Sequence, residues 1–155
     1  MKNLLKLSAV STLVLISINA FAASQQAEEL KKFTTWAEQT ESTMSSALDA
    51  VVTKVGGMDA AGAEAASAEF NKTRDAHFAE LDALSIKSEE IKPLVAKYKE
   101  KVQADADVVA ASVAFAKEPK PELQAKMTEA TNKMQEADKA FSELEDKLGE
   151  QFPEE

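Results

Sequence analysis

The sequence predicts an all-α protein: an up-down-up-down four-helix bundle with antiparallel neighbours and a heptad-like core, which follows a cleaved signal peptide. Three observations lead to this prediction. Apolar residues recur at steps of three and four along four long segments, no segment alternates with a period of two, and the links between the segments are short. Short links place consecutive helices side by side, so the four apolar faces can be buried together.

Residues 1–22 have the features of a secretory signal peptide. Lys2 and Lys6 precede an apolar run over residues 7–18, and small residues occupy the positions that a signal peptidase inspects before a cut after Ala22. The apolar run is too short to span a bilayer as a stable helix. We therefore expect export, most simply to a bacterial periplasm.

The mature chain, residues 23–155, has the length of one helical-bundle domain. Its first helix is predicted from about Ser24 to Val55. The pair Gly56-Gly57 is expected to end this helix, because glycine accepts the left-handed conformation of a helix C-terminus. The apolar stripe of this helix consists of Leu30, Phe33, Ala37, Thr40, Met44, Ala47, Val51 and Val55.

The second helix is predicted to begin near Asp59, a good capping residue, and to run to about Leu84. Gly62 should weaken its first turns. The third helix is predicted from about Pro93 to Ala116. The inward residues of these two helices are Ala63, Ala66, Phe70, His77, Leu81 and Leu84, followed by Leu94, Tyr98, Val102, Ala106, Val109, Val113 and Ala116.

The fourth helix is predicted to start at or near Pro121, where the missing amide donor of proline costs nothing. Its apolar stripe has no interruption and consists of Leu123, Met127, Ala130, Met134, Ala137, Phe141, Leu144 and Leu148. Because only the first helix carries a matching stripe, we expect these two helices to form the rigid pair of the bundle. Alanine is frequent in the stripes, so a second chain could supply further buried area, and a homodimer is an alternative to a monomer.

Charge and the absence of cysteine exclude several functions. Removal of residues 1–22 takes away Lys2 and Lys6, so the net charge falls from −9 to −11. Such an excess of acid argues against nucleic acid and anionic lipid as general partners. The absence of cysteine excludes disulfides, thiol catalysis and covalent haem attachment. Bacterial lipid attachment also needs a cysteine after the cut, so we expect a soluble product without an anchor.

His77 is the single histidine, and its spacing places it on the inward face of the second helix. One interpretation is an axial ligand of a non-covalently bound haem, with Met44 or Met134 on the opposite side. The other is a core histidine with a hydrogen-bond partner, beside methionines that fill space. We favour the second interpretation and expect no cofactor. One imidazole is too little for a zinc or di-iron site, so we also expect no metal.

No catalytic motif is present. The sequence lacks a Gly-x-Ser-x-Gly elbow and a phosphate-binding glycine loop, and no two carboxylates stand out as an acid–base pair. We therefore expect no enzymatic activity. Four basic residues, Lys92, Lys97, Lys99 and Lys101, could dock an acidic partner. Pairing with nearby acids on adjacent helices explains them more simply, and we favour that interpretation.

These observations predict a small, soluble, acidic, exported bundle that acts by binding to protein or cell-envelope partners. Chaperone-like, adaptor and inhibitor roles all fit the pattern. Two alternatives remain open: a haem-binding bundle that uses His77 and a methionine, and an amphipathic lipid-binding protein whose helices open to expose their apolar stripes.

Overall fold

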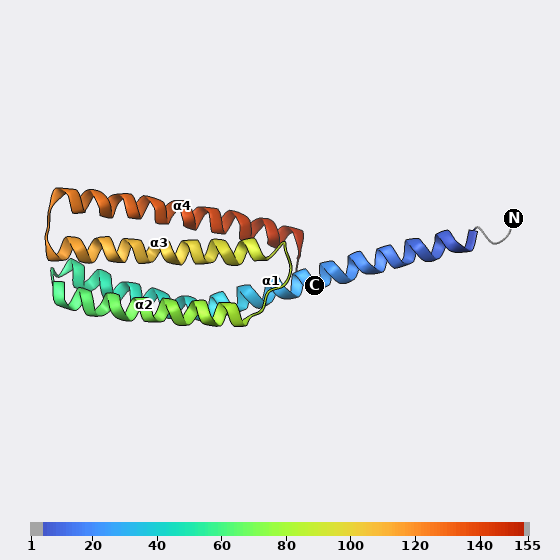
Figure 1. The fold of residues 1–155 in the computed structure, drawn as a ribbon, viewed down its shortest axis with the longest axis horizontal. Helices are drawn as coiled ribbons and strands as arrows, with labels where there is room; N and C mark the ends of the chain where they lie inside the picture. Colours follow the sequence, from blue (N-terminus) through green and yellow to red (C-terminus); the bar gives the residue numbers. More distant parts are fainter. Residues whose placement is uncertain (1–4, 154–155) are drawn as a thin grey trace.

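Four helices and no strand make up the residues described by the computed structural model, which are 5–153 for the backbone and 24–153 for the side chains. The helices are α1 (Leu5–Gly56), α2 (Ala60–Ala83), α3 (Lys92–Lys117) and α4 (Pro121–Gln151). They run up and down beside one another as an all-α bundle, and the N-terminal part of α1 projects beyond it (Figure 1). The predicted fold class is confirmed.

The start of the first helix was predicted incorrectly. The structure has one continuous helix from Leu5, whereas the sequence suggested a start near Ser24. The physical reason is that neither glycine nor proline occurs between Leu5 and Val55, so nothing in the chain interrupts the backbone hydrogen bonds. The prediction of a signal peptide over residues 1–22 concerns side chains that lie outside the described residues and stays a prediction.

The bundle consists of two closely packed hairpins, α1 with α2 and α3 with α4. Helix α3 also packs on both α1 and α2. Among the described residues, α1 and α4 are not one of the closely packed pairs, so the expectation that they form the rigid pair is wrong. They are bridged instead by large side chains, since the rings of Phe33 and Phe141 have centroids 6.2 Å apart.

The most deeply buried helix is α3, not α4. All seven inward residues predicted for α3, from Leu94 to Ala116, are buried. In α4 only Ala130, Phe141 and Leu148 are buried, and the rest of its stripe is half-buried. This difference arises because α3 contacts three helices whereas α4 packs closely on α3 alone. The spacing of apolar residues predicted both stripes, but it did not predict which of the two helices is buried more deeply.

The turn between α1 and α2 has a different left-handed residue from the one predicted. Met58, not a glycine, adopts the left-handed conformation, with φ of 53°, and Gly56 and Gly57 do not. The Asp59 amide donates to the Lys54 carbonyl at 2.9 Å, which fixes this tight turn. The predicted cap is confirmed, because the Asp59 carboxylate accepts from the Gly62 amide at 2.9 Å.

Gly62 has a structural role that the sequence did not reveal. A Cβ atom at this position would overlap the Asp59 carboxylate and lie 2.9 Å from Cδ of Lys54. Lys54 and Asp59 form an ion pair at 3.3 Å, so the space beside Gly62 is filled by this pair. The absence of a side chain therefore allows the cap to form.

The link between α2 and α3 is held by the first helix. The Glu29 carboxylate accepts hydrogen bonds from the Lys87 and Ser88 amides at 3.0 and 2.8 Å. Lys32 Nζ donates to the Leu84 carbonyl at 2.6 Å. Although desolvation opposes ionisation, the hydrogen bonds from Ser88 and its neighbours keep the pKa of Glu29 below its ordinary value. Side chains of α1 thus fix the crossing between the two hairpins.

Candidate functional site

A layer of aromatic rings from three helices lies in the core of the bundle, and we call it the Tyr98 layer. It consists of Phe33 and Trp36 of α1, Tyr98 of α3 and Phe141 of α4. The Tyr98 ring lies 5.3 Å from Trp36, 5.8 Å from Phe33 and 5.7 Å from Phe141, each in an edge-to-face arrangement. Edge-to-face pairs add to the burial energy of the rings, so this layer ties the two hairpins together.

The hydroxyl of Tyr98 leads from this layer to a group of polar side chains. Burial raises the pKa of Tyr98, and a hydrogen bond with Thr40 partly opposes the increase. The Thr40 hydroxyl also donates to the Trp36 carbonyl of the preceding turn, at 2.9 Å. The polar end of the tyrosine is therefore satisfied inside the bundle, as expected for a buried hydroxyl.

Six carboxylates interact with Lys101 or with Glu145 beside the Tyr98 layer, and we call this group the acidic face. Lys101 of α3 pairs with Asp138 of α4 at 2.8 Å, and its ammonium lies 5.6 Å from the Phe141 ring centroid. The Asp138 oxygen of this pair is buried and has no well-aligned hydrogen bond. The six carboxylates belong to Glu38 and Glu41 of α1, Asp105 of α3, and Asp138, Glu145 and Asp146 of α4.

The acidic face carries more negative charge than Lys101 can compensate. Burial raises the pKa of Asp105 to about 6, with Lys101 opposing the increase and Asp138 adding to it. Burial also raises the pKa of Glu145; the charge of Asp146 adds to this increase, Lys101 opposes it, and Glu38 and Glu41 add smaller effects. A carboxylate with a raised pKa is more stable when protonated or when it meets a further cation.

His77 lies in the core between α1 and α2. It is 5% exposed, and its ring stands edge-on to Trp36 with centroids 6.1 Å apart. Its Nδ1 atom is buried without a hydrogen-bond partner, so the partner expected for a core histidine is missing at this atom. Burial lowers the pKa of His77, and the charge of Glu80 opposes this only in part.

The two methionines proposed as haem ligands do not lie at the level of His77. Met44 is eight residues beyond Trp36 on α1, which is about 12 Å along the helix at a rise of about 1.5 Å per residue. Met134 is seven residues before Phe141 on α4, or about 10 Å. Axial ligands must face each other across one iron atom, and the fold does not bring these residues together. Within residues 24–153 no group of three or more histidines and acids could hold a metal ion.

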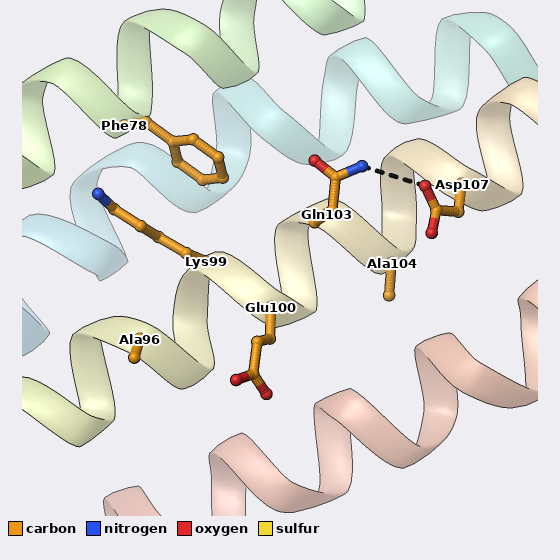
Figure 2. Close-up of a pocket in the computed structure, with 7 residues that line it drawn as sticks. All are labelled: Phe78, Ala96, Lys99, Glu100, Gln103, Ala104 and Asp107. Atoms are coloured by element: carbon orange, nitrogen blue, oxygen red, sulfur yellow. Dashed lines mark hydrogen bonds between the residues drawn. The ribbon is translucent and has the colours of Figure 1, made fainter.

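A shallow groove runs along the outer face of α3, and Figure 2 shows the residues that line it. Its volume is about 500 Å³. Phe78 of α2 forms one side, where Lys99 lies 5.5 Å from the ring centroid and pairs with Asp82 at 2.6 Å. Gln103 donates to Asp107 at 3.0 Å along the groove. The remaining lining residues are Ala96, Glu100 and Ala104.

The four lysines of α3 are all paired with acids, but only two of them pair with acids on adjacent helices, as favoured from the sequence. Lys99 and Lys101 pair across helices with Asp82 and Asp138. Lys92 and Lys97 pair with acids three residues away in the chain, Glu89 and Glu100. These lysines therefore neutralise charges inside the bundle and do not form a separate docking surface.

Comparison with known proteins finds a match to the family model described as "Uncharacterised lipoprotein PM1805", over residues 27–153. The chain belongs to this family. No curated protein and no solved structure matches it. The family match begins five residues after the predicted cut at Ala22 and covers nearly all of the residues whose side chains the structure describes.

The family description indicates an exported, envelope-associated protein and agrees with the expected export. It does not agree with the expectation of a simple secreted product, since the family is described as lipoproteins. The printed sequence contains no cysteine, the residue that carries the lipid of bacterial lipoproteins. In the part of the chain that the structure describes, no helix is long and apolar enough to cross a membrane.

The acidic face was missed by the sequence analysis. Asp105 follows the buried Val102 by three residues and precedes the buried Val109 by four. Asp138 stands three residues before Phe141, and Glu145 stands four residues after it. A carboxylate at helical spacing from buried residues is the signal that could have found them. It was overlooked because many other acids in this chain are exposed.

Proposed function

We propose that this envelope-associated protein binds a basic segment of another protein at the acidic face and has no enzymatic activity of its own. One observation supports the proposal most directly: six carboxylates from three helices lie close enough to interact with Lys101 or with Glu145, next to the Tyr98 layer. Lysine or arginine side chains of a partner would supply the missing positive charge. Adaptor, chaperone-like and inhibitor roles all use such a contact, and its place would be the periplasm, after cleavage of residues 1–22.

The packing of the bundle favours this face over others. Helices α1 and α4 are bridged by side chains and not by close backbone packing, so a partner can approach the carboxylates between them. Half-buried apolar residues, Leu48 of α1 and Met134 of α4, lie along the same two helices. A segment with alternating basic and apolar residues would match both kinds of surface.

The proposal is tested by calorimetric titration with a synthetic peptide of lysine, arginine and leucine, using protein expressed from its full sequence. Glu41→Lys and Glu145→Lys should each weaken binding at least about tenfold, because each places a positive charge where the peptide's cations would lie. Asp49→Lys and Glu136→Lys make the same change on the same two helices, at exposed positions outside the acidic face. They should change the affinity by less than about threefold, since salt screens distant charges.

Two results would contradict the proposal. Equal losses in all four variants would mean that the peptide responds only to net charge. A wild-type protein that ignores the peptide at low ionic strength would mean that the acidic face does not take basic segments. Circular dichroism of each variant verifies that the bundle is still folded.

A further inference from the structure

His77 is a buried titratable side chain that the function proposed above does not use. It is 5% exposed, and its Nδ1 atom has no hydrogen-bond partner. A neutral imidazole can occupy this position, because no charge is buried there. An imidazolium carries a proton on both ring nitrogens, so it would need an acceptor inside the bundle. Protonation of His77 must therefore change its surroundings.

Glu80 is the carboxylate that can serve an imidazolium at His77. It lies three residues after His77 on α2, and side chains at this spacing are neighbours on a helix surface. Burial lowers the pKa of His77, and the charge of Glu80 partly opposes that decrease. In the structure, however, the Glu80 carboxylate accepts a hydrogen bond from the indole N–H of Trp36, at 3.3 Å. Glu80 thus stands between two groups that can use it.

Trp36 connects this site to the rest of the bundle. The side chain is 8% exposed, and its ring stands edge-on to both His77 and Tyr98, with centroids 6.1 and 5.3 Å apart. Its N–H is the single donor of the indole, and the bond to Glu80 is longer than a typical N–H···O bond. If Glu80 turned away, a buried donor would be left without an acceptor, which favours exposure of the indole to water.

The other charged side chains around this site are occupied elsewhere. Glu38 follows Trp36 on α1 but acts on the pKa of Glu145 in α4. The remaining charges have partners at 2.8, 2.6 and 2.6 Å: Arg74 with Asp75 on α2, Lys32 of α1 with the Leu84 carbonyl, and Lys99 of α3 with Asp82 of α2. Of all the described residues, Glu80 alone changes the pKa of His77 through its charge.

We propose that His77, Glu80 and Trp36 form an acid-sensitive switch between α1 and α2. While His77 is neutral, Glu80 holds the indole of Trp36. When His77 takes up a proton, the Glu80 carboxylate turns to the imidazolium, and Trp36 loses its acceptor and moves toward water. The contact of α1 with α2 and Tyr98 then loosens while the helices stay formed. This switch lies outside the acidic face and does not rest on the function proposed above.

The switch acts in mildly acidic solution. Because burial lowers the pKa of His77 from 6.5, the proton binds only below that pH. Loosening of α1 lets water reach the imidazolium, so protonation and loosening favour each other. Asp105 has the opposite effect, because its pKa of about 6 is raised by burial and its protonation favours the closed bundle. Titration of Asp105 therefore cannot cause the loosening.

The test uses the fact that the chain has one histidine and one tryptophan. Protein expressed from its full sequence is titrated from about pH 8 to about pH 4, the range in which histidine changes its charge. Nuclear magnetic resonance follows the His77 ring, and fluorescence follows Trp36. Both should give the same midpoint, below 6.5, with the emission moving to longer wavelength as the indole meets water. Far-ultraviolet circular dichroism should stay constant through this transition.

Four variants identify the groups that take part. His77→Gln stays neutral at every pH and should abolish the emission shift. Glu80→Gln still offers an acceptor to Trp36 but no charge to the imidazolium, so the midpoint should move to lower pH and the emission shift should become smaller. Glu69→Gln makes the same change at an exposed position of α2, more than two turns away, and should leave the midpoint unchanged. Asp105→Asn should also keep the transition.

Three results would overturn the proposal. An emission shift that persists in His77→Gln would come from another group. A His77 ring that titrates while the Trp36 emission stays constant would mean that the two side chains are not coupled. Loss of the circular dichroism signal at the same midpoint would mean that the whole bundle unfolds. If His77→Gln does not fold, Glu80→Gln provides the test, because an unchanged midpoint in that variant equally contradicts the switch.

Discussion

Lys101 and Asp105 are one helical turn apart on α3, yet Lys101 pairs with Asp138 of α4, at 2.8 Å. Asp105 thus stays a half-buried carboxyl without an ion pair at close range, and burial raises its pKa to about 6. A group in this state reduces the stability of the bundle at neutral pH. Such a carboxyl beside an open pair of helices favours a binding role for this face.

The first prediction concerns the pH dependence that Asp105 causes. The pKa of Asp105 is about 6 in the folded protein and about 3.8 in the unfolded chain. Between these pH values the carboxyl is protonated in the folded protein but ionised in the unfolded chain. The contribution of Asp105 to stability is therefore favourable below about pH 4 and is lost as the pH rises through 6. Asp105→Asn should stabilise the protein at pH 7.5 by about 1 kcal/mol, a value reduced for partial solvation of the carboxyl.

Thermal unfolding at several pH values measures this effect. A gain of about 1 kcal/mol corresponds to a melting temperature about 4 °C higher for a domain of this size. The difference between Asp105→Asn and the unchanged protein should disappear near pH 4. Asp107→Asn makes the same substitution at an exposed position on the same helix and is the control for the change of residue type. A destabilised Asp105→Asn at pH 7.5 would show that the ionised carboxyl has a favourable partner.

The second prediction is that His77 resists protonation. Burial disfavours the charged imidazolium, and the charge of Glu80 opposes this only in part, so the pKa of His77 in the folded state is below the ordinary value of 6.5. As the pH falls, His77 is protonated in the unfolded chain at a higher pH than in the folded protein. The stability that His77 contributes above pH 6.5 is therefore lost as the pH falls through its folded-state pKa. Nuclear magnetic resonance of the single histidine measures this pKa directly. A midpoint above 6.5 would mean that Nδ1 donates to an acceptor.

The third prediction is that Phe141 anchors α4. Phe141 contacts both Phe33 and Tyr98, so Phe141→Ala removes the ring that joins the two hairpins. We expect a loss of about 3 to 5 kcal/mol in the free energy of unfolding, measured with urea. Leu144→Ala, at a half-buried position one turn away, should cost clearly less. A loss below about 1 kcal/mol for Phe141→Ala would mean that the layer is not closed in solution.

The fourth prediction compares two glycines in helices. Gly149→Ala should stabilise α4 by up to about 1 kcal/mol, because nothing lies near its added Cβ atom and alanine favours the helix. Gly62→Ala should instead lower the stability, because its Cβ atom displaces the Asp59 carboxylate from the cap. Thermal unfolding of both variants gives the comparison. A gain of equal size at both positions would mean that Asp59 can move aside without loss.

The four apolar stripes, both ends of α2 and α3 and the start of α4 could be predicted from the sequence, because they depend on contacts within a few residues along the chain. Tyr98 and Phe141 were both placed correctly on inward faces. The pairing of the helices could not be predicted. Whether α1 approaches α4 depends on the combined volume of Phe33, Tyr98 and Phe141, which lie far apart in the chain.

The same reason explains what was missed in the candidate site. The raised pKa of Asp105 comes from burial between helices and from Asp138, neither of which leaves a local pattern. The tight turn from Lys54 to Asp59 places Met58 in the left-handed conformation. The sequence analysis had predicted this conformation for Gly56 and Gly57, because glycine adopts it most easily. The residue composition did narrow the kinds of site to consider, since a chain with one histidine and no cysteine has few possible metal or thiol sites.

The hydrogen bonds between the Glu29 carboxylate and the α2–α3 link affect the order in which parts of the chain fold. Each hairpin can form from residues that are close in sequence, whereas the bonds from Glu29 to the link join residues 58 and 59 positions apart. Helical bundles dominated by local contacts fold quickly, and closing a long loop costs chain entropy before its contacts are gained. We expect the two hairpins to form first, and the joining of Glu29 to Lys87 and Ser88 to complete the native state.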